Sequence, residues 1–135
     1  MKFIGSPLLA LLAGVTIAVV TVSTASAADF SGTWSASAVF EQNGQIAYTT
    51  TPVCTFQQFG SRISGTCKGP NALGPAVGTT DGSTISWRWT ATANATGRTG
   101  VSSWKGTLDS DGVIRGHMSG AANPGLMAPF TAQRQ

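Results

Sequence analysis

Apolar and polar residues alternate along most of the chain from about residue 28 onward, and turn residues recur at short intervals. Within 30–40 the even positions are apolar or small and the odd positions are mostly polar. A period of two is typical of a β-strand with one buried face, and no clear helical period competes with it. The alternation predicts strands at 30–40, 45–59, 62–68, 73–79, 84–92, 100–108, 113–119 and 126–134.

These eight segments, joined by short turns, predict an all-β fold. An antiparallel up-and-down β-barrel is the expected architecture, because closing the sheet removes both of its exposed edges. A two-sheet sandwich is the alternative.

Glycine turns determine which residues face each other. Asn43-Gly44 is the strongest short hairpin signal in the chain. A two-residue turn at Gly60-Ser61 places Cys54 opposite Cys67 at a non-hydrogen-bonded pair, where the backbones approach closely. We expect a structural disulfide worth about 3 kcal/mol, with two reduced cysteines as the alternative. On this register one face collects Cys54, Phe56, Gln58, Ile63, Gly65 and Cys67.

The next glycine turn follows the strand at 73–79. A three-residue loop at 80–82 predicts that Val77 lies opposite Ile85. Trp87 and Trp89 then share the face of Ile85, and the intervening polar residues point outward.

The turn before residue 113 decides where the charged residues of the following strand point. A three-residue loop predicts Trp104 opposite Met118 inside the barrel, with Arg115 and His117 outside. An even-length loop would bring Arg115 and His117 inside. We favour the first because it keeps apolar residues on one face.

The first 27 residues have the pattern of a secretory signal peptide. Lys2 provides a basic start, 8–22 is an apolar run, and 25–27 has the small-x-small form of a cleavage site. Cleavage after Ala27 leaves residues 28–135 as a single domain. The sequence therefore predicts secretion to the periplasm or the outside, and it contains no second apolar segment long enough to span a bilayer.

The remaining composition excludes several functional classes. Without Lys2 the chain has seven Lys or Arg against five Asp or Glu, a net charge of about +2. A net charge this small is not typical of a nucleic-acid-binding protein. One His and two Cys without ligand spacing predict neither a metal site nor a cofactor. The sequence does not define an oligomeric state.

Gly32-x-Trp34 on the first strand, with Arg134 on the last strand, resembles the signature of the calycin group. This group includes lipocalins, avidins and bacterial metalloprotease inhibitors. The segments TISWRW and VSSWKGTL are similar in layout to the tryptophan strands of avidins. The resemblance implies a structural role for Trp34 and Arg134, whose guanidinium would lie over the indole in a cation–π contact.

The resemblance also places tryptophans in a ligand pocket. Trp87 or Trp89, together with Trp104, would occupy the positions of avidin pocket tryptophans. We expect a small apolar or aromatic ligand bound by these three residues, Gln58 and Met118. The alternative is a barrel packed solid by its own side chains.

Two other functions remain open from the sequence alone. One is a calycin-like protease inhibitor, which would act through the chain ahead of Gly32, although only residues 28–31 precede it after cleavage. The other is a barrel enzyme, an isomerase or lyase that uses His117 and Arg115 turned inward.

Overall fold

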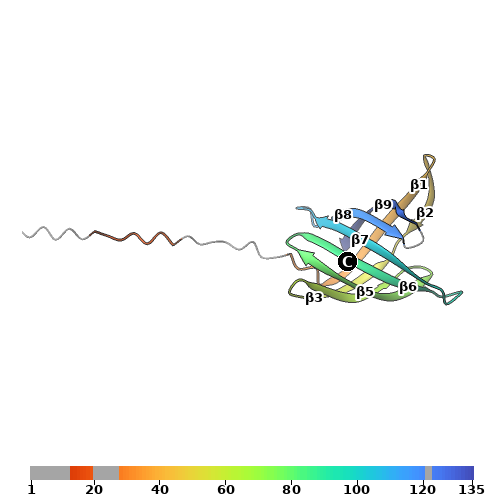
Figure 1. Cartoon of the computed structure of the whole chain (residues 1–135), viewed down its shortest axis with the longest axis horizontal. Helices are drawn as coiled ribbons and strands as arrows, with labels where there is room; N and C mark the ends of the chain where they lie inside the picture. Colours follow the sequence, from red (N-terminus) through yellow and green to blue (C-terminus); the bar gives the residue numbers. More distant parts are fainter. Residues whose placement is uncertain (1–12, 20–27, 121–122) are drawn as a thin grey trace, which may run out of the picture.

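The computed structural model describes residues 13–19, 28–120 and 123–135, and it contains a closed antiparallel β-barrel (Figure 1). The strands are β1 (Gly32–Gln42), β2 (Gln45–Thr50), β3 (Val53–Phe59), β4 (Arg62–Lys68), β5 (Ala72–Asp81), β6 (Thr84–Ala93), β7 (Thr99–Leu108), β8 (Ile114–Gly120) and β9 (Asn123–Arg134). The barrel runs from β1 through β3 to β9 in chain order, and pairing of β1 with β9 closes it. The prediction of an eight-stranded antiparallel barrel is confirmed, and β2 is an additional strand.

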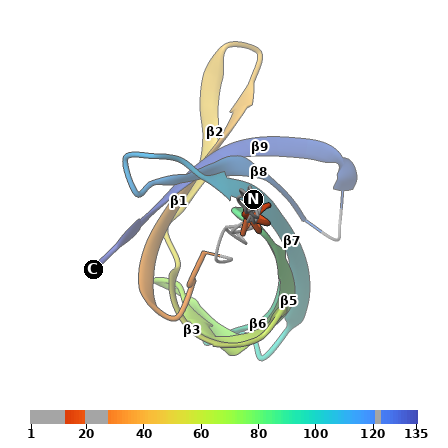
Figure 2. The ribbon, with the colours of Figure 1, turned by 90° about the vertical axis from the view of Figure 1, so that its left-hand side faces the viewer.

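The β1–β2 hairpin projects from one end of the barrel (Figure 1), and in a view down the barrel it stands out from the ring of strands (Figure 2). We call this end the mouth. The opposite end carries the turns Gly60-Ser61 and Gly82-Ser83, and we call it the closed end.

The additional strand comes from the segment predicted as one strand at 45–59. Pro52 has no N–H to donate to a ladder, and it separates β2 from β3. β2 pairs with residues 38–42 of β1, the half nearer the mouth. β3 pairs with residues 32–35 of β1, the half nearer the closed end. The hairpin between β1 and β2 turns at Asn43-Gly44 as predicted, and both residues have positive φ.

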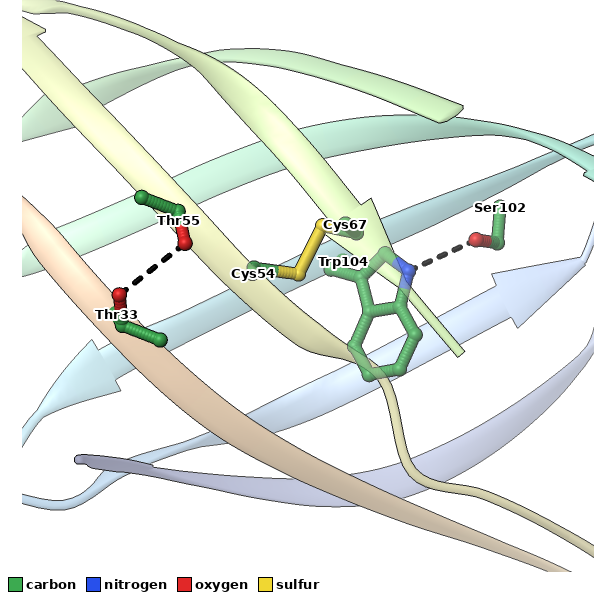
Figure 3. The surroundings of a disulfide bond; sticks show 6 residues. All are labelled: Thr33, Cys54, Thr55, Cys67, Ser102 and Trp104. Atoms are coloured by element: carbon green, nitrogen blue, oxygen red, sulfur yellow. Dashed lines mark hydrogen bonds between the residues drawn. A yellow bond between two sulfur atoms is a disulfide. The ribbon is translucent and has the colours of Figure 1, made fainter. Parts of the chain in front are cut away.

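The disulfide predicted between Cys54 and Cys67 is present. The two residues pair directly across β3 and β4, and both are buried. Figure 3 shows the bond bridging the two strands. A bond of this kind is compatible with an oxidising compartment.

The predicted loop at 80–82 is wrong. Asp81 pairs with Thr84, so the turn is the two-residue Gly82-Ser83, with Gly82 at φ +59°. This shift turns Val77 outward, where it faces Arg88 instead of Ile85.

Aromatic side chains fill the middle of the barrel. Trp87 stacks on Trp104 with ring centroids 5.5 Å apart and the planes 6° from parallel. Phe56 and Phe130 meet Trp87 edge to face at 5.3 and 5.5 Å. All four tryptophans of the chain are buried, as the alternation predicts.

The closed end is sealed by the chain just before β1. Phe30 is fully buried, and its carbonyl accepts a hydrogen bond of 2.9 Å from the indole N–H of Trp34. The Arg134 guanidinium lies 4.4 Å from the centre of the Trp34 ring. Arg134 also donates to the carbonyl oxygens of Ser31, at 2.6 Å, and Asp29. One arginine therefore holds the entering chain, the first strand and the last strand together.

Replacing Arg134 with alanine is expected to lower the free energy of unfolding by about 1–2 kcal/mol, since it removes a cation–π contact and two charge-assisted hydrogen bonds. Urea denaturation measures the change. Arg88→Ala is the matched control, because Arg88 is an exposed arginine on the outer wall. A loss in the control as large as that in Arg134→Ala would contradict the sealing role.

Most of the predicted signal peptide lies outside the described residues. Of it, the structure describes residues 13–19, which are exposed and have no regular secondary structure. Across residues 13–19, 28–120 and 123–135 we find no helix that is long and apolar enough to cross a membrane.

Candidate functional site

A pocket of about 390 Å³ lies at the mouth. Its inner wall is formed by Trp89, Trp104 and Met118, three of the residues predicted to bind ligand. The residues that line it are Phe40, Tyr48, Thr50, Trp89, Ala91, Gly100, Val101, Ser102, Trp104, Met118, Gly120 and Leu126. Ligand pockets in proteins commonly span roughly 300 to 1,000 Å³ and are mostly apolar, so this pocket has the size and character of a small-molecule site.

The β1–β2 hairpin supplies two aromatic lining residues that the sequence analysis missed. Phe40 and Tyr48 pair across the hairpin, with ring centroids 5.9 Å apart. A regular ladder from Asn43-Gly44 would place Ala47 opposite Phe40. A β-bulge in the hairpin shifts the pairing by one residue and brings Tyr48 there instead.

The tryptophans of the pocket differ in how their N–H groups are satisfied. The indole N–H of Trp104 donates to the Ser102 hydroxyl at 2.8 Å (Figure 3). The indole nitrogen of Trp89 is buried and has no hydrogen-bond partner among the described residues. A buried donor without a partner costs about 1–3 kcal/mol. This nitrogen is fully buried, so Trp89 presents ring carbons rather than its N–H to the pocket.

A second, smaller pocket of about 200 Å³ adjoins the first. It is formed by the segment 69–72 together with Tyr48, Thr49, Thr50, Trp89 and Ala91. Four of these residues also line the larger pocket, so Trp89 forms part of the wall of both.

Trp87 does not line the mouth pocket. It lies one layer deeper, packed against Phe56, Trp104 and Phe130, and it is 2% exposed. Its indole nitrogen also has no partner among the described residues. The structure therefore brings Trp89 and Trp104 to the mouth but gives Trp87 the surroundings of a core residue.

Gln58 lies at the closed end, away from the other predicted ligand-binding residues. Its side-chain oxygen accepts from the backbone N–H of Phe30 at 2.8 Å. Its side-chain nitrogen donates to the carbonyl oxygens of Ala28 and Gly60 at 3.2 and 3.0 Å. These contacts tie the chain ahead of β1 to the closed end.

The charged residues of β8 lie on the outer wall. The loop after β7 has its glycine at the third position, so the predicted pairing of Trp104 with Met118 is confirmed and Arg115 and His117 are exposed. Arg115 forms ion pairs of 2.7 and 2.8 Å with Asp109 and Asp111. Its hydrogen bonds lower the pKa of the Asp111 carboxyl, and the two carboxylates raise the pKa of Arg115.

The described ranges hold no group of three His, Cys, Asp or Glu side chains placed to bind a metal ion. Comparisons of the chain with protein-family models, with curated proteins and with solved structures gave no match.

Proposed function

We propose that this protein is a secreted, calycin-like barrel that binds a small apolar or aromatic molecule at its mouth. The observation that carries the proposal is the pocket of about 390 Å³ walled by Trp89, Trp104 and Met118. An indole presents a flat apolar face on which a ring stacks, and Met adapts its shape to an irregular ligand.

Two features support the compartment and the family. The buried disulfide between Cys54 and Cys67 suits an oxidising environment, and the sequence ahead of residue 28 has the pattern of a secretory signal. The closed barrel, with Arg134 over the ring of Trp34, suits a calycin-like architecture.

The positions of other residues favour binding over the two alternatives. A protease inhibitor needs a free segment ahead of β1, but Phe30 is buried and Gln58 and Arg134 hold its neighbours. A reaction chamber needs Arg115 and His117 inside, and both side chains are on the outer wall.

Introducing a charge at the rim of the pocket is expected to weaken ligand binding. Leu126 lines the pocket and is 52% exposed, so Leu126→Arg adds a cation there without disturbing the core. The neutral fluorescent probe N-phenyl-1-naphthylamine is titrated into the protein that lacks residues 1–27. We expect the wild-type protein to enhance its fluorescence, and Leu126→Arg to raise the Kd at least about tenfold through desolvation of the new charge.

Met127→Arg is the matched control. Met127 is the next residue on β9, is 64% exposed and does not line the pocket. It is expected to leave the Kd unchanged. An equal loss in both variants would place the probe elsewhere on the surface, and failure of the wild-type protein to bind the probe or any other neutral aromatic compound would reject the proposed function.

A further inference from the structure

We infer that the ligand is a flat aromatic molecule held between the β1–β2 hairpin and the barrel, and that the ring of Tyr48 covers the side of the ligand that faces away from the barrel. This inference rests on the proposed function and adds to it the shape of the ligand and the residue that selects for this shape. It comes from the exposed surface of the mouth pocket, from the residues that the two mouth pockets share, and from the attachment of the hairpin.

Most of the exposed apolar surface of the larger pocket lies on its outer side. Trp89, Trp104 and Met118 form the inner wall but are only 5%, 1% and 4% exposed. Tyr48 and Leu126 line the same pocket and are 60% and 52% exposed. A ligand gains free energy by covering apolar surface that water otherwise contacts. Tyr48 therefore offers more surface to a ligand than any residue of the inner wall.

Tyr48 and Trp89 each line both mouth pockets, the larger and the smaller. The other two residues that the pockets share are Thr50 and Ala91, whose side chains are small. The pockets thus meet beside one aromatic ring from the hairpin and one from the barrel, with no other bulky side chain in common. This arrangement suits a flat ring system that extends from one pocket into the other, because aromatic rings stack favourably on each other.

Tyr48 belongs to a part of the fold that is attached to the barrel along one strand. β1 pairs with β9 only as far as Ala38, and within the described ranges β2 pairs with β1 alone. Beyond Ala38 the hairpin is a two-stranded ribbon that stands out from the ring of strands (Figure 2). At its base Phe40 packs against the core and keeps the Tyr48 ring beside the pocket. A two-stranded ribbon is held weakly by its own pairing, so Tyr48 can approach the barrel when a ligand fills the pocket.

The lining of the two pockets determines which compounds are suitable for a test. None of the described residues that line them is Asp, Glu, Lys, Arg or His. An ionised ligand would lose its hydration here without gaining a counter-charge. The test therefore compares neutral compounds that differ in shape.

Two neutral compounds with the same skeleton test the inference by displacement of N-phenyl-1-naphthylamine: 2-naphthol, which is flat, and decahydro-2-naphthol, which is saturated and puckered. In the protein that lacks residues 1–27, 2-naphthol is expected to bind about tenfold more tightly, the gain from aromatic stacking. Burial of apolar area alone gives the flat compound no such advantage. Tyr48→Leu, which keeps apolar bulk but removes the ring, is expected to reduce the advantage to at most about threefold, and Tyr48→Phe is expected to keep it.

Ile46→Ala is the matched control, because Ile46 lies on the same strand, is 68% exposed and lines neither mouth pocket. It is expected to leave the affinity for both compounds unchanged. A second measurement needs no variant. Tyr48 is the only tyrosine of the chain, so protein labelled at tyrosine gives the NMR ring signals of this residue alone. These signals are expected to move upfield when 2-naphthol stacks on the ring and to stay in place with decahydro-2-naphthol.

Equal affinity for the two compounds in the wild-type protein, or a full advantage of 2-naphthol in Tyr48→Leu, would overturn the inference while the proposed function stands. An equal loss for both compounds in Tyr48→Leu would also overturn it, since Tyr48 would then supply only apolar surface. The inference fails as well if the probe binds and neither compound displaces it. Failure of the protein to bind any neutral aromatic compound would instead reject the proposed function itself.

Discussion

Replacing Gly116 with alanine is expected to lower the free energy of unfolding by at least about 3 kcal/mol, the upper range for overpacking a closely packed site. Gly116 pairs with Gly106 across β7 and β8. A Cβ at Gly116 would lie 1.9 Å from the carbonyl oxygen of Lys105 and 2.5 Å from the Cα of Gly106. These are backbone atoms of the neighbouring strand, so no side-chain rotation relieves the clash and the two strands must separate.

Gly120→Ala provides the control within the same strand. Gly120 also lies in β8, and a Cβ built there meets no atom of the described residues within 4 Å. Its free energy of unfolding is expected to stay within about 0.5 kcal/mol of the wild-type value. Chemical denaturation of both variants measures the difference. Similar losses of stability in both would mean that the requirement for glycine at 116 comes from the general cost of adding a side chain and not from close contact between β7 and β8.

Replacing Trp87 with alanine is expected to destabilise the barrel by about 3–5 kcal/mol, the usual cost of removing a large buried aromatic side chain. The indole of Trp87 contacts three other rings, those of Phe56, Trp104 and Phe130, at centroid distances of 5.3–5.5 Å. Its loss leaves a cavity in the middle of the barrel, because neighbouring strands are held by their ladders and cannot collapse to fill it. Urea denaturation of the variant and the wild-type protein measures the loss.

Phe59→Ala is the control for Trp87→Ala, since Phe59 is aromatic but 73% exposed on the outer wall. Its effect is expected to stay within about 0.5 kcal/mol. If Trp87→Ala does not yield folded protein, Trp87→Phe, with a smaller cavity, supplies the measurable loss. A stability of Trp87→Ala equal to that of Phe59→Ala would show that the aromatic cluster does not support the fold.

The turns explain how far the pairing of strands follows from the sequence. Gly60-Ser61 and Gly82-Ser83 are the same type of turn, with glycine first and φ near +60°. The turn at Gly60-Ser61 predicts the correct register of β3 against β4, and this register places Cys54 opposite Cys67. At the second, the Asp81-Gly82 pair resembles the end of a three-residue loop of the kind that does occur at Gly112. A two-residue and a three-residue loop both fit the local sequence here. The two loops differ in which side chain they turn inward, and in the structure it is Ala76 rather than Val77 that packs inside the barrel.

The break in the segment 45–59 is readable from the sequence, because Pro52 within an alternating run is a signal against a continuous strand. The place of Tyr48 is harder to foresee. A β-bulge depends on how the hairpin twists beyond the barrel, and no residue near Asn43-Gly44 specifies it in the sequence.

The candidate site shows what the alternation of apolar and polar residues cannot predict, which is how deep in the barrel an inward side chain lies. Alternation places Trp87, Trp89 and Gln58 on inner faces, and all three side chains lie on those faces. It does not report depth along the barrel axis, which depends on strand tilt and stagger. Trp89 consequently reaches the mouth, Trp87 the middle and Gln58 the closed end, although the sequence treats them alike.

The seam between β1 and β9 joins residues about one hundred positions apart, such as Trp34 and Arg134. During synthesis β1 therefore has no partner on one side until almost the whole domain has left the ribosome. Until that moment two strand edges are open to pairing with other chains. This topology favours closure in a single late step, in which the last strand pairs with the first and both open edges disappear together.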